Sequence, residues 1–446
     1  MRIVNGKYEL PPGNNLWRSL LASFTFLKDP IRAISRNMIR YSGTYSAILI
    51  GRGKIILTED PDFIQYVLRE NHTNYQKSEL SSKTAARLFG NGLLFSNGGP
   101  WLRQRRLIQP AFHQGKIQGL YEIVIKTANE IISDFEEGEK IDLYPLMRRL
   151  SFGVLIHSLF DIRLSPETIL ELSEGFTDMQ DFLLKDVNQP FRKFLYPINR
   201  AERAILEKSR SIRNIVKGII DKRLEEKEMH NDLLDMLLNV KYEDTGETMA
   251  QEQIIDEILV LLFAGHETTA NTLSWLLYLI ATNAGEAEKL KESISKIKIT
   301  DSPKDEYINA VISESMRLYP AAWMTERVAL SDDRFGGFSY PKGTIIIPFF
   351  YGLHRNKHNW EKESTFDPGR FIHSDTVKTK KAKNFFPFGA GPRMCIGNNF
   401  AMAEMSFILH ALLTKFEISA TDEIPGMWPL ITLRPRNLRM NFKRIK

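Results

Sequence analysis

The stretch NFFPFGAGPRMCIGNNFAMAEM, residues 384–405, decides the fold, because it holds Cys395, the only cysteine of the chain. Glycines and prolines surround this cysteine, and a run with helical character follows at once. A free cysteine is most often just a small buried hydrophobic residue. Here the glycines let backbone N–H groups point at the sulfur, and the positive end of the following helix adds to them. Both effects lower a pKa that starts at about 8.5 and predict a thiolate, acting as a nucleophile or as a metal ligand.

The metal-ligand interpretation is the stronger of the two. No histidine lies within this loop to act as the base for a nucleophile, although one could approach from elsewhere in the fold. A haem iron needs only one protein thiolate, which a chain with a single cysteine can supply. The loop is not a dinucleotide-binding fingerprint, because Met394 stands where that motif requires its third glycine.

The composition is that of one integrated globular chain. Its length of 446 residues would by itself suggest about three domains, but no linker, low-complexity tract or repeat divides it, so we expect a single domain over residues 1–446. The single cysteine excludes an internal disulfide and suits a reducing compartment, and the N-terminus lacks a signal-peptide pattern. Its apolar segment is short and interrupted by Arg18. We expect a cytoplasmic monomer without a membrane anchor.

The net charge of +6 could indicate a nucleic-acid partner. However, bases and acids are interleaved along the helical stretches, and no zinc-finger or RNA-binding pattern is present, so no nucleic acid is expected. The one dense basic run is KTKKAK, residues 378–383, just before the cysteine loop. We expect an acidic protein partner to dock there, near Lys380, Lys381 and Lys383.

The hydrophobic pattern predicts a mainly α fold with a smaller β part. After an N-terminal segment (1–44), β-branched runs flank a glycine turn and predict a hairpin over 45–58. The strongest helix is predicted over 251–282. It is apolar on nearly every face, which is typical of a helix at the centre of a large protein. Strand-like runs follow, and the cysteine loop spans 384–400.

Polar residues interrupt the middle of this central helix. Gly265 costs about 1 kcal/mol against Ala in a helix interior, and a buried Glu267 costs more unless it is paired. Thr268 can bond a carbonyl one turn back and bend the helix. The segment indicates either a kinked helix that presents a hydroxyl and an acid to a cavity, or a polar stripe against another helix. A zinc-protease site is excluded, because Ala270 stands where the second histidine would be.

Five motifs together resemble the cytochrome P450 family. FPFGAGPRMCIG (386–397) is similar to its haem-binding signature, AGHETT (264–269) to its oxygen-activation motif and ESMR (314–317) to its Glu-x-x-Arg pair. FDPGRF (366–371) resembles its meander motif, although Gly369 stands where Glu is common, and WLRQR (101–105) resembles its Trp-x-x-x-Arg element. The five follow the order of the family, whose fold is a helix-rich core around a long central helix with small antiparallel sheets.

The resemblance implies a role for each matching residue. Cys395 would be the metal ligand, on the iron of haem b, and its thiolate would favour O–O cleavage. Phe388 would pack beside the sulfur, and Ala264 and Gly265 would lie against the haem. Arginine suits carboxylates because of its two-point fork. The residues expected at the haem propionates are Trp101, Arg105, Arg327 and Arg393. Ordinary packing or surface ion pairs are the alternative for the first three.

Two further groups follow from the same resemblance. Glu314 and Arg317, which by spacing alone would be an exposed helix pair of little weight, are expected to form a buried structural network with Arg370 beneath the haem. Thr268 and Glu267 are expected to be the catalytic alcohol and acid that deliver protons to oxygen.

The implied activity is a monooxygenase that uses O2 to hydroxylate a small organic substrate or to demethylate it at oxygen or nitrogen. Electrons would come from NAD(P)H through a ferredoxin or flavodoxin with its reductase, because the chain ends about 50 residues after Cys395 with no reductase segment. A peroxide-using or isomerising haem–thiolate enzyme, a haem-based sensor or carrier, and a haem-free scaffold are the alternatives. A fatty acid, a terpenoid and a methylated sugar all remain open as substrates.

Overall fold

The computed structural model describes all residues except 1, 5–7, 16, 20–24, 27, 50–52, 163, 190–195, 197–199, 227–229, 231, 243–245 and 373–382. The chain forms two compact units, each assembled from segments far apart in sequence. The first unit comprises Met1–Ser81, Ser313–Cys395 and Ile431–Leu433, and the second comprises Ser82–Ile312, Ile396–Leu430 and Arg434–Lys446. A single domain over residues 1–446 stays a prediction.

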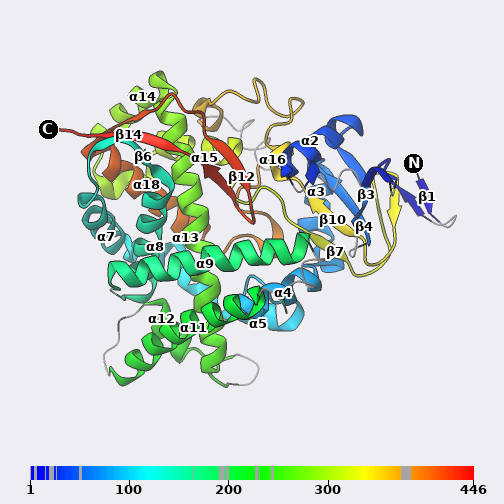
Figure 1. Cartoon of the computed structure of the whole chain (residues 1–446), viewed down its shortest axis with the longest axis horizontal. Helices are drawn as coiled ribbons and strands as arrows, with labels where there is room; N and C mark the ends of the chain where they lie inside the picture. Colours follow the sequence, from blue (N-terminus) through cyan, green and yellow to red (C-terminus); the bar gives the residue numbers. More distant parts are fainter. Residues whose placement is uncertain are drawn as a thin grey trace. The chain divides into compact units, whose positions relative to one another are not determined.

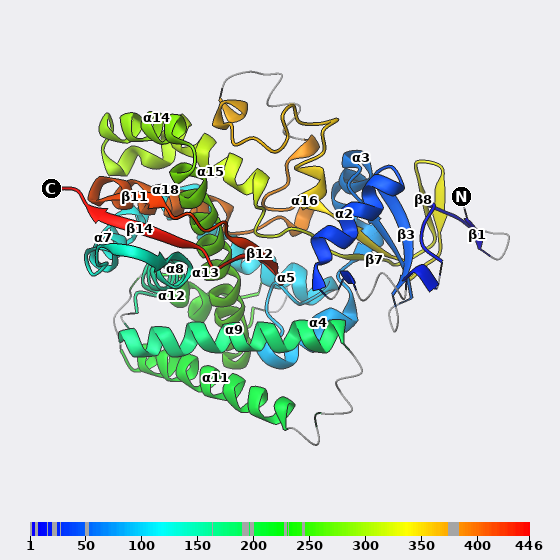
Figure 2. The ribbon, with the colours of Figure 1, turned by 45° about the horizontal axis from the view of Figure 1, so that its top comes forward.

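A five-stranded sheet in the order β3-β4-β10-β7-β5 forms the centre of the first unit. β3 (Thr44–Leu49) and β4 (Gly53–Thr58) pair antiparallel, and β10 (Ile345–Pro348) runs parallel to β4. β7 (Arg327–Ala329) joins β10 antiparallel, and β5 (Tyr75–Gln76) closes the sheet. Figures 1 and 2 show these strands side by side, in blue and yellow.

Alternating side chains bury both faces of this sheet, as the two-residue period of a strand requires. On one face, Ile55 and Ile345 pack with Ile34 of α2 (Pro30–Arg40). On the other face, Ile56 and Ile346 lie in a group of buried side chains that also contains Phe386 and Ala390 of the cysteine loop. The sheet therefore provides the apolar platform on which the cysteine loop is held.

Shorter elements complete the first unit. They are β1 (Arg2–Val4), β2 (Tyr8–Leu10), α3 (Pro61–Gln65), the π-helical turn η1 (Tyr66–Glu70), η2 (His72–Asn74), β8 (Asp333–Phe335), β9 (Phe338–Tyr340), α16 (Phe350–Leu353), η6 (Pro368–Phe371) and η7 (Gly391–Arg393). β1 pairs with β2 and β8 with β9, both antiparallel. Two further helices cross the boundaries given above, α4 (Glu79–Phe89) and α15 (Glu306–Leu318).

The second unit is mainly helical. Its helices are α5 (Gly98–Ile108), η3 (Gln109–Phe112), α6 (Gln114–Gly119), α7 (Tyr121–Ser133), α8 (Leu143–Phe160), α9 (Pro166–Asn188), α11 (Ala201–Glu225), α12 (Leu233–Asn239), α13 (Gln251–Ala281), α14 (Ala284–Ser295), η5 (Ile299–Lys304) and α18 (Asn398–Lys415). α13 packs along α8, and α9 lies beside α11, as both views show (Figures 1 and 2). An antiparallel sheet of β6 (Gly138–Asp142), β11 (Phe416–Ala420) and β14 (Arg439–Arg444) borders these helices, and β12 (Gly426–Pro429) pairs with β13 (Leu433–Arg436).

The central helix α13 is almost entirely buried, which its all-round apolar sequence predicts. It runs without interruption through Gly265 and Thr268. Nowhere in the described part of the chain is a helix both long and apolar enough to cross a membrane. The predicted mainly α architecture with small sheets is confirmed, with one parallel strand pair, β4 and β10, added to the antiparallel ones.

Candidate active site

The cysteine loop presents its sulfur at the surface of the first unit. Cys395 forms no disulfide bond and is exposed, and its backbone N–H donates to the carbonyl of Phe388 at 2.9 Å, which closes the turn. Gly389 and Gly391 have φ angles of +71° and +68°, in the left-handed region that favours glycine. At Gly391 a Cβ atom would lie 1.8 Å from the carbonyl oxygen of Leu68 in η1, so only glycine allows the two backbones to meet.

His354, at the end of α16, anchors the start of this loop. Its fully buried ring accepts a hydrogen bond from the backbone N–H of Phe386 through Nε2, at 2.9 Å. Burial lowers the pKa of His354 to about 3, so the ring is neutral and can accept. Phe350 and Phe385 flank the ring. No sequence motif marks this residue, because its partner is a backbone atom that no side-chain pattern reveals.

Three cations gather within the first unit. Arg327, on β7, is buried and donates to the Thr325 hydroxyl at 3.2 Å and the Glu326 carbonyl at 2.8 Å. Burial lowers the pKa of Arg327 to about 10. The pKa of Lys77 lies well below its usual value because of burial and of the nearby charges of Arg327 and Arg393. Arg327 and Arg393 were predicted as anion ligands, and the structure adds Lys77, a half-buried residue after β5 that no motif marks.

The residue types of the first unit fit a haem better than a metal ion bound by several protein ligands. No group of three His, Cys, Asp or Glu side chains within the described ranges could hold a metal ion. One exposed thiol in a tight glycine loop, together with like charges that an anionic ligand would neutralise, matches a cofactor that takes one sulfur ligand and carries carboxylates.

Glu314, Arg317 and Arg370 come together in a buried network. Arg317 donates two hydrogen bonds to Glu314, Nε to Oε2 at 2.7 Å and Nη2 to Oε1 at 2.8 Å. Arg370 Nε lies 3.4 Å from Glu314 Oε1. Arg317 also donates to the carbonyls of His354, Glu363 and Thr365. The network thus connects α15 to the segment around η6 and to the residue that anchors the cysteine loop.

The second unit holds the remaining predicted site residues. In the middle of the buried helix α13, Leu261, Ala264, Gly265 and Thr268 keep partial exposure. Their spacing of three and four residues puts them on one stripe of the helix. Thr268 Oγ1 donates to the carbonyl of Ala264 at 2.9 Å. α13 therefore presents one accessible stripe, and the threonine hydroxyl lies on it.

Gly265 serves the packing of two helices. A Cβ atom at this position would lie 2.8 Å from Cδ2 of Leu155 on α8. The glycine that was expected to lie against a cofactor thus also allows α13 to approach α8 closely.

Glu267 does not share the accessible stripe. Its side chain is buried, and Oε1 lies 3.2 Å from Nη2 of Arg434 on β13. One of the two interpretations of this segment had Thr268 and Glu267 facing one cavity, but consecutive residues point about 100° apart around a helix. The acid is instead held in an ion pair with a strand that lies far away in sequence. Arg434 was missed because no local pattern connects it to α13.

Glu404, on α18, was also missed. Its fully buried carboxyl group lies 3.1 Å from the Ser151 hydroxyl of α8 and 3.2 Å from the Thr269 hydroxyl of α13. Burial raises the pKa of Glu404 to about 8, so it is largely protonated at neutral pH. The acid therefore connects three helices next to Thr268 without carrying a charge.

Trp101 and Arg105 lie four residues apart on α5 and are half-buried. Arg105 Nε donates to Gln109 Oε1 at 3.1 Å. Of the expected docking lysines, Lys380 and Lys381 fall outside the described residues. Lys383 is exposed, with Nζ 4.0 Å from Oδ1 of Asp62.

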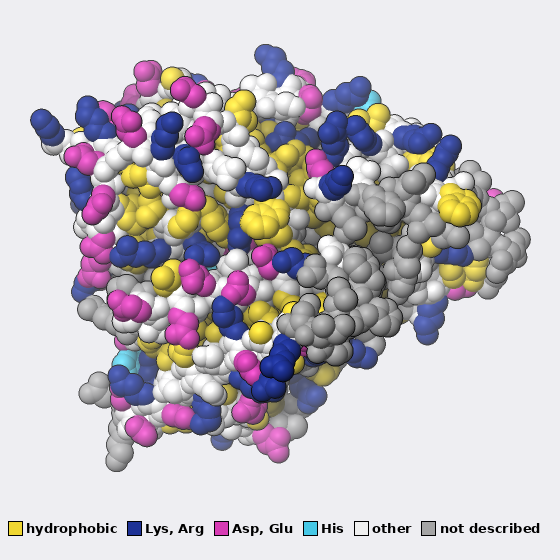
Figure 3. Space-filling view, viewed as in Figure 1, with side chains coloured by type: hydrophobic (Ala, Val, Ile, Leu, Met, Phe, Trp, Pro, Cys, Tyr) yellow, Lys and Arg dark blue, Asp and Glu magenta, His cyan; other side chains and the backbone are white. Residues whose placement is uncertain are grey.

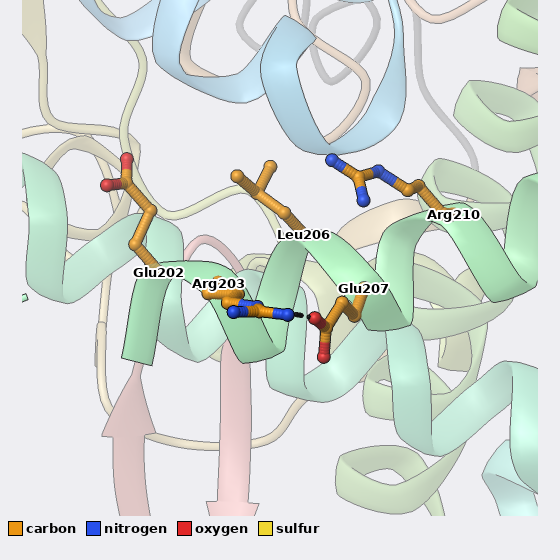
Figure 4. Close-up of a pocket in the computed structure, with 5 residues that line it drawn as sticks. All are labelled: Glu202, Arg203, Leu206, Glu207 and Arg210. Atoms are coloured by element: carbon orange, nitrogen blue, oxygen red, sulfur yellow. Dashed lines mark hydrogen bonds and ion pairs between the residues drawn. The ribbon is translucent and has the colours of Figure 1, made fainter. Parts of the chain in front are cut away.

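A charged hollow lies elsewhere, on α11. It has a volume of about 410 Å³ and is lined by side chains of that helix alone: Glu202, Arg203, Leu206, Glu207 and Arg210 (Figure 4). Arg203 Nε donates to Glu207 Oε1 at 2.8 Å, so the two charges neutralise each other. No predicted site residue lines this hollow. On the face drawn in Figure 3, Lys and Arg side chains lie interleaved with Asp and Glu side chains, as on an ordinary solvated surface.

Comparison with known proteins places these features in one family. The family model of Cytochrome P450 matches residues 11–442. The chain is 30% identical over 394 residues to cyclooctat-9-en-7-ol 5-monooxygenase from Streptomyces melanosporofaciens, covering 86% of this chain and 84% of that protein. It is 29% identical to cytokinin hydroxylase from Arabidopsis thaliana, over 83% of this chain and 74% of that protein. The crystal structure of the cytochrome P450DA heme domain superposes with a TM-score of 0.87 at 22% identity, over 98% of each chain. The predicted fold is thereby confirmed.

Proposed function

This chain belongs to the cytochrome P450 family of monooxygenases, and from that premise we propose that Cys395 is the protein ligand of a haem b iron. The observation that carries the proposal is the exposed thiol of the only cysteine, held in a loop that glycine alone can form. When bound, the haem supplies the iron at which dioxygen is reduced. Electrons come from NAD(P)H through a ferredoxin or flavodoxin with its reductase.

The residues of the first unit hold the cofactor in this proposal. Phe388 packs at the turn that the Cys395 N–H closes. Arg327, Arg393 and Lys77 bind the haem carboxylates, which relieves the repulsion among the three cations. The Glu314 network keeps the loop in place. Trp101 and Arg105 of α5, which belong to the second unit, are the further residues proposed to bind haem carboxylates.

In this proposal, the accessible stripe of α13 faces the substrate and takes part in proton delivery. Ala264 and Gly265 leave room beside the cofactor, and the Thr268 hydroxyl, bonded to the Ala264 carbonyl, keeps its lone pairs available to accept a further hydrogen bond. Glu267 is the acid that supplies protons to this hydroxyl.

The substrate we propose is a largely hydrocarbon molecule of the terpenoid type, which is hydroxylated. One relative is named for action on cyclooctat-9-en-7-ol, an unsaturated alcohol by its name. Close to the stripe, Phe263 packs against Phe89 with ring centroids 4.3 Å apart, and Phe95 lies 6.4 Å from the same ring. The loop that carries Phe95 is tied to α13, because Glu257 Oε2 accepts the N–H of Leu93 at 2.8 Å. Phe89 and Phe263 are buried and Phe95 keeps partial exposure, and a site lined by such an aromatic cluster favours a hydrocarbon over a sugar.

The spectrum of the reduced protein with carbon monoxide tests the ligand. Protein supplied with haemin and shown by circular dichroism to be folded is expected to give the red-shifted Soret band of thiolate ligation. The Cys395→Ser variant is expected to lose that band while it keeps the fold. A wild-type spectrum without the band would end the proposal.

Titration of the ferric protein tests the substrate class. A cyclic terpenoid alcohol is expected to displace the water from the iron and shift the Soret band, whereas a fatty acid and a methylated sugar of similar size leave it unchanged. Product analysis with a reconstituted redox chain then separates hydroxylation from demethylation. A response to the sugar alone would overturn the assignment.

A further inference from the structure

Arg434 and Glu267 form a buried ion pair between β13 and the central helix. Their side chains are 7% and 4% exposed, and Nη2 of Arg434 lies 3.2 Å from Oε1 of Glu267. Two aromatic rings lie against the guanidinium, that of Tyr144 at 4.7 Å and that of Trp428 at 5.6 Å. Within the described residues the Nε atom of Arg434 is buried without a hydrogen-bond partner. The guanidinium is therefore held by one carboxylate and by ring faces.

This ion pair fixes the direction in which the Glu267 side chain points. Thr268 lies on the accessible stripe of α13, whereas the preceding residue, Glu267, is turned toward β13. To give a proton to the face of Thr268, the carboxyl group must leave Arg434 or exchange protons beside it. A buried carboxylate without a cation would instead take up a proton, because burial disfavours its charge. Arg434 thus controls both the charge and the direction of Glu267.

Of the two aromatic rings that cover the ion pair, one is partly exposed to solvent. Tyr144 is buried, but 41% of the Trp428 side chain is exposed. Trp428 belongs to β12, which pairs with β13, so the residue that holds the acid and the ring that covers it lie on one hairpin. The two residues are therefore positioned by the same pair of strands.

We propose that Arg434 is the positioning residue of Glu267: it keeps the carboxylate ionised and turned toward β13, and proton supply to the face of Thr268 depends on this pair and on its Trp428 cover. The inference rests on the proposed function of Glu267 as the proton-supplying acid.

Other titratable groups near the pair bear on its pH dependence. They are Tyr144 and Arg148 on α8, Asp181 on α9 and His266 on α13. Burial lowers the pKa of His266 to about 4, so this ring stays neutral. Burial raises the pKa of Asp181, and it raises that of Tyr144, where the charge of Glu267 adds to the effect. Arg148 interacts electrostatically with Tyr144 and His266, and each variant below leaves it unchanged.

A stability cycle tests the pairing without reference to turnover. The variants are Arg434→Met, Glu267→Gln and the double variant, with Arg436→Met, an exposed position on the same strand, as the control. Arg434→Met is expected to lower the melting temperature, and increasingly so from pH 5 to pH 8, because the unpaired carboxyl group is ionised in the unfolded chain but not in the folded one. In the double variant, Glu267→Gln is expected to restore most of the melting temperature that Arg434→Met loses. If the two single losses simply add in the double variant, the pair does not exist.

Turnover then separates positioning from mere support of the fold. In the reconstituted enzyme, Arg434→Met is expected to raise the ratio of peroxide to product and the solvent deuterium isotope effect severalfold, with the carbon monoxide spectrum and substrate affinity unchanged. Arg434→Lys, which keeps the cation, is expected to restore most of the coupling. A wild-type ratio and isotope effect in Arg434→Met would overturn the proposal. A wild-type protein that lacks the thiolate Soret band would refute the proposed function instead. The stability cycle would still show whether Arg434 and Glu267 form a pair.

Discussion

Arg317 holds Glu314 by two parallel hydrogen bonds, 2.7 and 2.8 Å long, and neither side chain is exposed to solvent. The same guanidinium donates to the carbonyl of His354, whose ring accepts the N–H of Phe386 at the start of the cysteine loop. The ion pair is thus two contacts away from the loop that carries Cys395. We therefore expect the integrity of this pair to affect the position of that loop.

Glu314→Gln is expected to destabilise the fold by about 3–5 kcal/mol, because it leaves Arg317 buried without its counter-charge. Urea unfolding followed by circular dichroism measures the loss. The control is Lys296→Gln, which breaks an exposed ion pair with Glu292 on α14 and should change stability little. Equal effects of the two substitutions would contradict the buried role.

Gly391→Ala and Gly389→Ala form a matched pair. Both positions have a positive φ, so an alanine costs about 1–2 kcal/mol at either one. Only at Gly391 does the added Cβ atom collide with a backbone carbonyl, that of Leu68, whereas nothing lies within 4 Å at Gly389. We expect Gly391→Ala to lose the thiolate Soret band and Gly389→Ala to retain it. The reverse order would show that the approach to η1 does not shape the loop.

Lys77→Gln and Arg327→Gln are each expected to preserve or raise the stability of the haem-free protein and to weaken haemin binding. Each removes repulsion among three neighbouring cations, so the melting temperature of the haem-free protein should stay the same or rise. Each also removes a partner for a carboxylate, so haemin should bind more weakly in a titration. Arg334→Gln, at an exposed position on β8, serves as the control. A parallel loss of stability and haemin affinity would indicate a purely structural role.

Thr268→Ala removes the hydroxyl on the accessible stripe of α13. Haem and substrate binding are expected to remain, while electrons are diverted from product to peroxide, because the proton donor at this face is lost. Thr272→Ala is the matched control, since its hydroxyl donates to the carbonyl of Thr268 at 2.9 Å in the same way but lies at a buried position. A Thr268→Ala enzyme that stays fully coupled to product would refute the assignment.

Glu404 gives the stability of the protein a pH dependence with a definite sign. Its pKa in the folded chain is about 8, above the ordinary value of 4.5, so the folded state keeps a proton that the unfolded state has lost. Stability therefore falls as the pH rises between these two values. Glu404→Gln, which cannot ionise, is expected to flatten this part of the melting-temperature profile. An unchanged slope in the variant would mean that another group carries it.

The local features of this fold could be read from the sequence. A helix over 251–282 follows from apolar residues on every face, and the structure has α13 at Gln251–Ala281. The tight loop at Cys395 follows from glycines that the backbone requires, as the φ angle of Gly391 shows. Periodicity and glycine positions record the conformation of neighbouring residues, and a single chain therefore suffices to infer them.

The partners of Glu267, Lys77 and Glu404 were decided by the tertiary structure alone, whereas Glu314 finds Arg317 within its own helix. Glu267 was expected to act together with Thr268, and the structure shows that it pairs with Arg434, while Lys77 joins the two predicted arginines. Glu404 bridges helices whose contacts no motif records. A buried charge or polar group must find its partner wherever the packed chain brings one. For these three residues the partner lies far away in sequence. The sequence therefore determined which residues are candidates for the chemistry, and the packing of the chain determined which residues hold them in position.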